Sequence, residues 1–316
     1  MYNRVILSNQ VFNMRKKVHG ASLLFAIFFG FSFMFSKVAL ATLSPIGLSA
    51  YRFLTAWVGF EILRQLGVVK IRFSKPILKS VFIVALFQPI LYFLFEMYGL
   101  SMITSAEAGM MIALIPVFTS VFGMILLKEK PKPVQFVFIV LSVAGILFIQ
   151  ITQLRQGFDV SFLGYGLLFL SVISAALYNI TSRYASVTVK PYEVTYHMMA
   201  MGALFFNLVY LIQLVSQQKL SHYGVELMTN AVYLPILYLG LIASIGGFFM
   251  VNFALKYLQA HVVSVYANIS TIIAILAGAF ILNESLSWNH LIGSMMIIMG
   301  VYGTVRAENR LKKVIR

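Results

Sequence analysis

The chain contains no cysteine, and only 10% of its 316 residues are charged. The first absence excludes disulfide bonds and metal sites built on thiolates. The second lies far below the roughly one quarter of charged residues that soluble domains carry. Hydrophobic residues make up 60% of the chain, and the mean hydropathy is +0.91. Apolar runs of about 17 to 25 residues, enough to cross a bilayer as a helix, recur along the whole length. The sequence therefore predicts an all-α integral membrane protein.

Acidic residues are also scarce, since 9 Asp and Glu stand against 24 Lys and Arg, a net charge of +15. In a soluble protein this excess would indicate a nucleic-acid partner. In a membrane protein, basic loop residues set the orientation and attract anionic lipid headgroups at the cytoplasmic face. We therefore expect a lipid bilayer and no nucleic acid as partner. Residues 1–17 hold no separate apolar segment and are expected to form a short cytoplasmic tail.

We expect ten transmembrane helices, separated by polar stretches that contain Pro and Gly. If the amino terminus is cytoplasmic, the inside segments hold 20 of the 24 Lys and Arg. This asymmetry predicts a multi-pass protein of the cell (inner or plasma) membrane with both termini in the cytoplasm. The expected spans are residues 18–41, 46–66, 77–98, 101–127, 133–152, 162–184, 192–215, 231–251, 258–282 and 288–306.

The two halves of the chain resemble each other. A shift of 155 residues lays "GMILLKE" (123–129) on "GAFILNE" (278–284), and a shift of 146 pairs Lys37 with Arg183. Because each copy has five spans, an odd number, the second must enter the membrane from the opposite side. Two inverted five-helix repeats, residues 18–152 and 162–306, are typical of secondary transporters. A basic cytoplasmic tail, residues 307–316, is expected to follow.

The order and spacing of five segments carry a resemblance to a known family: "FFGFSFMFSKVAL" (28–40), "SAYRFLTAW" (49–57), "IALIPVFTSVFGMILLKEK" (112–130), "LSVAGILFIQ" (141–150) and "IGSMMIIMGVYG" (292–303). With them the chain resembles the drug/metabolite transporter superfamily, in particular the EamA-like ten-helix transporters, over residues 18 to 306. The second half departs from the first at Thr271, which stands opposite Pro116, and at Ala176, opposite Gly30. The resemblance implies carrier activity, often export of amino acids or other small metabolites.

Charged side chains inside spans are costly, so they usually face a water-filled path or one another. In the first half, four lie at similar depth near the outer ends of spans and are expected to neutralise one another: Lys37, Arg52, Glu96 and Glu107. The second half has an inner layer: Arg183, Glu193, His197, Lys256 and His261. Two such layers suit alternating gates, and a histidine titrates near neutral pH, as a coupling proton requires. The alternative is that these are interfacial charges and structural histidines.

Polar and aromatic side chains near the midplane are candidates for a substrate path. They are Ser32, Trp57, Gln88, Tyr92, Tyr178, Asn179, Asn252, Tyr266 and Asn268. Tyr266 and Asn268 lie about 200° apart around a helix, so one cavity can take both only if the span is distorted. Tyr and Asn between helices also serve as packing contacts. Glu129 and Glu284 end equivalent spans, where each could cap the helix that follows.

The pattern favours a secondary-active carrier that exports or exchanges small organic metabolites by alternating access, with no cofactor or metal beyond a proton. A multidrug or lipophilic-cation exporter is the alternative within the same class. An intramembrane enzyme would need a motif such as HExxH or GxSxG, and a channel would need a filter motif; the sequence shows neither. A monomer or a homodimer is expected, because Gly300 and Gly303 offer span ten a small-residue surface for close packing.

Overall fold

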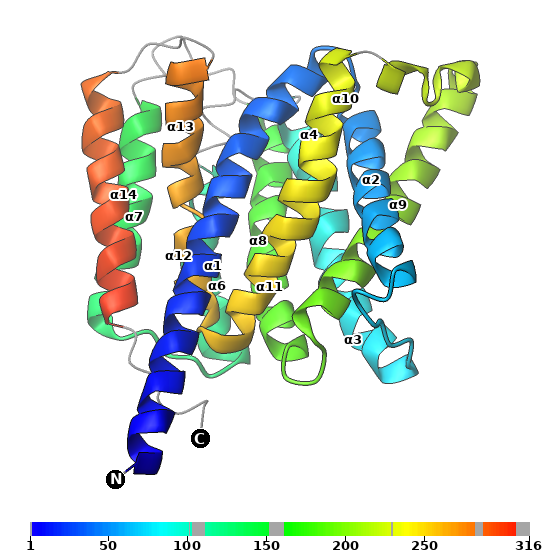
Figure 1. Ribbon diagram of the computed structural model, residues 1–316. Coiled ribbons are helices and arrows are strands. Elements are labelled where there is room, and N and C mark those ends of the chain that lie inside the picture. Colours follow the sequence, from blue (N-terminus) through cyan, green and yellow to red (C-terminus); the bar gives the residue numbers. More distant parts are fainter. Residues whose placement is uncertain are drawn as a thin grey trace.

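The protein is an all-α membrane protein. Its computed structural model describes residues 2–100, 102, 111–151, 161–228, 230–281 and 287–307, and these form helices and short connections without a strand. In Figure 1, α1 begins and α14 ends on the same side of the bundle. We call this side the terminal face and the other the opposite face. The arrangement agrees with an even number of spans.

The first half contributes five membrane-crossing segments. The third is interrupted at mid-length by a short π-helix, and the helix α6 of the fourth begins at Ile115. The five are α1 (Tyr2–Leu40); α2 (Pro45–Gln65); α3 (Lys75–Ala85), η1 (Leu86–Leu91) and α4 (Tyr92–Leu100); α6 (Ile115–Leu126); and α7 (Pro133–Ile151).

The second half repeats this order, and its third segment is interrupted at the equivalent place. Short 3-10 turns, η3 (Leu220–His222) and η4 (Val225–Met228), precede that segment. The five are α8 (Phe162–Ala185); α9 (Pro191–Ser216); α10 (Asn230–Leu237), η5 (Tyr238–Gly247) and α11 (Phe248–Tyr257); α12 (Ala260–Tyr266) and α13 (Ile269–Ile281); and α14 (Trp288–Arg306).

Most of these segments are long and apolar enough to cross a membrane. Six qualify on both counts: Asn13–Leu40, Lys75–Gly99, Phe162–Ala185, Pro191–Ser216, Val232–Tyr257 and Ala260–Ile281. Ile115–Leu126 and Pro133–Ile149 are apolar but shorter. The helix α1 starts at Tyr2, so the expected amino-terminal tail continues the first span as a helix that projects from the bundle (Figure 1).

In the first half, the local sequence explains why the third span is interrupted. Gln88 has φ −149° and ψ 121°, an extended backbone inside the helix, and it precedes Pro89. Proline has no N–H to give to the helix and disfavours helical geometry in the residue before it. The 155-residue shift lays η1 on residues 241–246, which lie inside η5. Helices interrupted near the midplane are where transporters built from inverted repeats place their binding sites.

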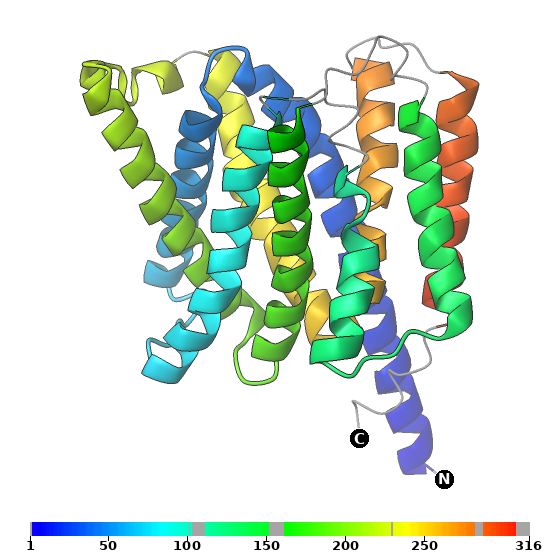
Figure 2. The ribbon, with the colours of Figure 1, turned by 180° about the vertical axis from the view of Figure 1, so that it is seen from behind.

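Packing between the helices follows a pseudo-two-fold relation. The second span packs on the seventh (α2 on α9) and the fifth on the tenth (α7 on α14). The contact of α1 with α13 has its counterpart in that of α8 with α6, and the contact of α4 with α8 in that of α11 with α1. Figures 1 and 2 show the α2–α9 pair at one edge of the bundle and the α7–α14 pair at the other. The structure therefore consists of two inverted five-helix repeats.

Glycines let α7 and α14 approach closely. A Cβ added at Gly300 would lie 2.6 Å from the carbonyl oxygen of Phe138, and one at Gly303 would lie 2.3 Å from the Phe138 ring. A Cβ at Gly145 would lie 2.6 Å from the carbonyl oxygen of Gly293. The small-residue surface predicted for span ten is thus filled within the chain by α7.

This contact predicts the effect of adding one methyl group. Gly300→Ala is expected to destabilise the protein by about 1–3 kcal/mol, because the new Cβ meets backbone that has to shift. The measurement is the melting temperature of the purified protein in one detergent. Gly166→Ala is the matched control, since Gly166 is an exposed glycine of α8 with nothing within 4 Å of its Cβ position. Equal melting temperatures for the two variants would show that α7 and α14 pack more loosely than described.

Candidate functional site

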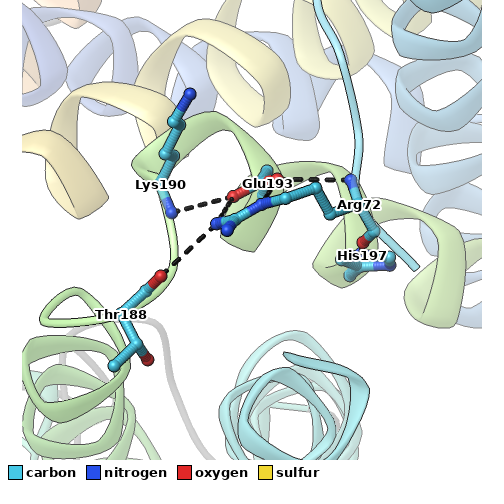
Figure 3. Close-up of polar contacts among 5 residues, drawn as sticks. All are labelled: Arg72, Thr188, Lys190, Glu193 and His197. Carbon is cyan, nitrogen blue, oxygen red and sulfur yellow. Dashed lines mark hydrogen bonds and ion pairs between the residues drawn. The ribbon is translucent and has the colours of Figure 1, made fainter. Parts of the chain in front are cut away.

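An ion pair on the terminal face joins the two halves of the chain (Figure 3). Arg72, in the connection between α2 and α3, donates from Nε to Oε1 of Glu193 at 2.7 Å and from Nη2 to Oε2 at 2.7 Å. Its backbone N–H also donates to Oε1 at 3.2 Å. The Glu193 side chain is fully buried, whereas that of Arg72 is about half exposed. Paired, bidentate hydrogen bonds of this kind are the strong form of an ion pair, and they raise the pKa of Arg72.

The first turn of α9 holds this carboxylate in place. Pro191 occupies the first helical position, and the N–H of Lys190 donates to Oε2 of Glu193 at 3.0 Å. Nη2 of Arg72 also donates to the carbonyl oxygen of Thr188 at 3.3 Å. The helix amino terminus favours a negative charge at this point. The connection between α2 and α3 is therefore fastened both to α9 and to the connection before it.

His197 extends the network along α9. Its Nε2 lies 3.3 Å from the carbonyl oxygen of Arg72, and its ring meets that of Phe73 edge-on with centroids 5.3 Å apart. The preceding residue, Tyr196, donates to Oε2 of Glu61 on α2 at 2.9 Å. Figure 3 shows His197 and Glu193 on the same helix, on either side of Arg72. The whole group, Glu61, Arg72, Phe73, Glu193, Tyr196 and His197, is called the terminal latch.

The opposite face has a counterpart without charge. The N–H of Gly224, between α9 and α10, donates to Oη of Tyr51 on α2 at 2.8 Å. The rings of Tyr51 and Tyr223 lie 5.7 Å apart. The sequence pairs Tyr51 with His197 under the 146-residue shift, so equivalent helices receive equivalent connections at the two faces. One contact is ionic and the other is neutral and aromatic.

A second ion pair on the terminal face connects the segment after α6 with three elements of the other half. Glu129 accepts from Nε of Arg183 at 3.1 Å and from the N–H of Ala260 at 3.0 Å. Arg183 donates from Nη1 to the carbonyl oxygens of Leu255 at 2.8 Å and Lys256 at 2.7 Å. Glu129 thus caps a helix, as expected for a helix-end carboxylate, but it caps α12 instead of α7. Together the pair closes the turn between α11 and α12.

A third cluster lies in the membrane-spanning part, nearer the opposite face. Arg52 on α2 is 7% exposed and donates from Nε to Oγ of Ser244 in η5 at 2.8 Å. Its Cζ lies 5.1 Å from the ring centroid of Phe93 and 5.7 Å from that of Phe53. Aromatic faces stabilise a guanidinium at this range. The buried cation therefore connects α2 to one interrupted span and contacts the other.

Glu96 completes this cluster from α4. Its Oε1 accepts from Oη of Tyr92, one helical turn earlier, at 2.8 Å. The Tyr92 ring lies 5.0 Å from that of Phe93, and the charges of Glu96 and Arg52 interact across the intervening space. We call Arg52, Phe53, Tyr92, Phe93, Glu96 and Ser244 the Arg52 cluster. Of the four outer charges expected to gather, it contains Arg52 and Glu96. Lys37 lies exposed on α1, and Glu107 falls outside the described residues.

In the second half, the oxygen and the nitrogen of the Asn252 side chain both form hydrogen bonds to neighbouring helices. Its Oδ1 accepts from Tyr178 at 3.0 Å and from Ser182 at 2.6 Å. Its Nδ2 donates to Oγ1 of Thr195 at 2.9 Å and lies 3.6 Å from Sδ of Met198. Asn252 has no exposed surface. Tyr178 and Asn252 therefore join α8, α9 and α11, which is the packing role that sequence reasoning held as the alternative.

The remaining midplane candidates spread over several helix contacts. Asn179 donates to Oγ1 of Thr119 at 3.4 Å and joins α8 to α6. Asn268 donates to Oγ of Ser142 at 2.9 Å and joins the end of α12 to α7. Tyr266 lies 2.9 Å from Nδ1 of His19 on α1. The ninth span is divided between α12 and α13 at this point, and Tyr266 and Asn268 face different neighbours.

Of the four remaining candidates, Trp57 interacts with Tyr196 of the terminal latch, and three stand apart from these contacts. Ser32 donates within its own helix to the carbonyl oxygen of Phe29 at 2.7 Å. Trp57 and Gln88 are half-buried, and Gln88 is the residue at which the third span departs from helical geometry. His261 is fully buried in α12. The structure thus brings Arg52, Tyr92 and Glu96 together, and separately Tyr178 and Asn252.

Sequence reasoning did not single out Arg72, Phe93 or Ser244. Arg72 was counted only as a loop cation, and Phe93 and Ser244 belong to residue types common in any membrane helix. The sequence does hold a weak signal for Arg72. A connection that docks on span seven should have its inverted counterpart between spans seven and eight, where Tyr223 and Gly224 dock on Tyr51.

Comparison with known proteins assigns the chain to a family. The model of the EamA-like transporter family matches residues 17–151 and again residues 162–306. "Uncharacterized transporter YcxC" of Bacillus subtilis (strain 168) is 36% identical over 297 residues, which cover 93% of this chain and 94% of that protein. An "uncharacterized transporter" of Archaeoglobus fulgidus is 25% identical over 280 residues, covering 88% and 95% of the two chains.

A solved crystal structure shares the fold. It superimposes with a TM-score of 0.74 over 94% of this chain and 99% of its own, at 17% sequence identity. At that identity the likeness concerns the arrangement of helices alone. The double match of the family model and the relative at 36% identity confirm the resemblance predicted from the sequence, and the chain belongs to the EamA-like transporter family.

Proposed function

We propose that the protein is a secondary-active carrier that exports or exchanges small organic metabolites, amino acids or related solutes foremost, by alternating access. The observation that carries this proposal is the equivalent docking at the two faces, where the connection after α2 binds α9 and the connection after α9 binds α2. A unit used in both orientations can close a path at either side in turn. Family membership supports transport, and the geometry supports the alternation.

The ion pairs of the terminal face support assigning the terminal latch as a gate. The terminal latch and the Glu129–Arg183 pair both join residues of the first half to residues of the second. Ion pairs with buried carboxylates form and break as units, because a carboxylate left unpaired in the bilayer is costly. We assign the latch to the side that opens into the cytoplasm, since basic residues are concentrated on that face.

Two alternatives receive less support. A lipophilic-cation exporter would find a carboxylate among aromatic rings at Glu96, yet Arg52 places a positive charge in the same cluster. A passive channel needs a continuous path, whereas the described helices carry ionic contacts across the two halves at the terminal face. Proton coupling through Glu107, His197 or His261 belongs to the proposal, and the latch bond of His197 makes it the residue to test first.

Transport itself is tested with purified protein in liposomes loaded with a pooled metabolite mixture. We expect selective, saturable loss of one chemical class, which mass spectrometry would follow for each compound against protein-free liposomes. Unlabelled solute inside should accelerate uptake of the labelled solute, because a carrier returns faster when loaded. Non-saturable loss of many compounds would indicate a channel, and a change in the mass of the solute would indicate an enzyme.

The latch is tested by cysteine labelling, for which a chain without cysteine offers a clean background. Ser186 is 2% exposed, close to the latch, and bonds only within its own helix. In Ser186→Cys protein, a bulky maleimide should react slowly. Adding Arg72→Ala should speed labelling several-fold, because it releases the connection that Arg72 ties to Thr188, two residues from Ser186. The control is Lys79→Ala, which removes an exposed charge from α3. Equal rates with and without Arg72 would contradict the gate.

Proton coupling predicts a response to pH. A pH gradient across the liposome should raise accumulation above the level reached at equal pH, and His197→Gln should abolish that increase. The variant should retain exchange without a gradient, since glutamine can still donate to the carbonyl oxygen of Arg72. Initial rates at several gradients provide the measurement. An unchanged gradient response in the variant would remove His197 from the coupling path.

A further inference from the structure

The guanidinium of Arg52 is buried yet not saturated. Among the described residues, its one hydrogen bond runs from Nε to Ser244, and its two terminal nitrogens make none. Neither terminal nitrogen is sealed from solvent, although the residue as a whole is only 7% exposed. An unsatisfied cation in the membrane is costly unless a partner reaches it. The terminal nitrogens therefore form an open, charged edge in an otherwise closed environment.

Glu96 presents a matching anionic edge. Its Oε1 accepts from Tyr92, while Oε2 has no hydrogen bond within the described chain and is likewise not sealed. The two charges interact, but they do not come within the 4 Å of a direct ion pair, unlike Glu129 with Arg183 or Glu193 with Arg72. One cation and one anion are thus held near each other without a direct ion pair between them.

The surrounding side chains hold both charges in position. Ser244 fixes Nε of Arg52, and Tyr92 fixes one oxygen of Glu96. Phe93 packs between the two groups. Its ring centroid lies 5.1 Å from Cζ of Arg52 and 5.0 Å from the ring centroid of Tyr92, which bonds to Glu96. Aromatic neighbours lower the local dielectric, which strengthens every charge interaction in the cluster. Because both charged groups are already held in position, a ligand can bind to both without either side chain having to rearrange.

We propose that Arg52 and Glu96 are the two poles of a zwitterion-binding site, in which Arg52 binds the carboxylate and Glu96 binds the ammonium group of one small solute. A carboxylate suits the fork of the terminal nitrogens, which bind such groups in pairs. A solute with one charge gains one contact and meets repulsion from the other pole. The site therefore selects for the presence of both charges rather than for a particular side chain.

The location of the poles connects binding to movement. Ser244 lies in η5, and Tyr92 is the first residue after η1, so each interrupted span carries one of the groups that orient a pole. A solute that bridges Arg52 and Glu96 would draw the two interrupted spans together across the pseudo-two-fold axis. This inference rests on the proposed carrier function and specifies the site that its substrate occupies.

The test compares a ligand with derivatives that lack one charge. Each of the common amino acids is added to purified protein, and the shift in melting temperature ranks them. The best stabiliser is then compared with its methyl ester, which lacks the carboxylate, and its N-acetyl form, which lacks the ammonium. Both derivatives should bind about tenfold more weakly or worse, the usual effect of losing a hydrogen bond to a charged group.

Substitutions of Arg52 and Glu96 test which charged group of the ligand each residue binds. In Arg52→Gln protein the preference for the amino acid over its methyl ester should disappear, while its preference over the N-acetyl form persists. Glu96→Gln should show the reverse pattern, and Lys79→Gln should retain both preferences. A purely structural role for Arg52 would weaken all ligands alike and leave the ratios unchanged, which would overturn the assignment. If a variant fails to fold, the comparison of derivatives on the native protein still decides.

The outcome is separable from that of the proposed function. If the metabolite-loaded liposomes show saturable transport of a solute with a single charge or none, the carrier function stands and the zwitterion site is wrong. If no amino acid binds and no pooled metabolite is transported, both proposals fall. Stabilisation by an amino acid that its ester and N-acetyl form match equally would also overturn the site, since neither pole would then contribute.

Discussion

The constraint on which this structure depends is that polar groups inside the bilayer have to find their partners within the chain. With so few charges available, each placement has a large effect. Glu193 and Glu129 sit at helix ends, where backbone N–H groups and an arginine satisfy them together. Asn252 uses both its oxygen and its nitrogen to join three helices. These contacts lie between helices that are distant in sequence, so they determine which helices are neighbours as well as how firmly they pack.

The pseudo-two-fold relation makes the two faces equivalent in shape but not in chemistry. At the terminal face the connection after α2 is held by a buried carboxylate, while at the opposite face the connection after α9 is held by tyrosines. Breaking the ionic contact leaves a buried carboxylate unpaired, which is costly, whereas the neutral contact consists of one hydrogen bond and aromatic packing. If these two contacts are the gates proposed above, they can open under different conditions, which a carrier needs if its two states are to be populated by different ligands or gradients.

The sequence predicted the spans because hydrophobic length and Pro-containing breaks are local properties. Span ten was expected at 288–306, where α14 lies, and the inverted repeat followed from the odd number of spans. It also placed Arg52 and Glu96 at similar depth. It did not reveal that Glu129 caps α12, because Ala260 lies 131 residues further along. Nor did it show that Tyr178 and Asn252 bond to each other, since that depends on the rotation of α8 and α11, which hydropathy does not specify. For the same reason, the sequence did not reveal that Arg72 pairs with Glu193.

If Arg52 belongs to the zwitterion site proposed above, its unsaturated guanidinium is the point at which stability and function oppose each other. A chain selected for stability alone would neutralise this guanidinium with a direct ion pair, as it does for Arg183, or replace it with an apolar residue. Here the cation is retained, anchored by one hydrogen bond, and kept apart from the carboxylate that could neutralise it. In the proposed zwitterion site, the ligand supplies the missing contacts during the working cycle. Asn252 differs in this respect, because Tyr178, Ser182 and Thr195 complete its hydrogen bonds and leave no group for a ligand to satisfy.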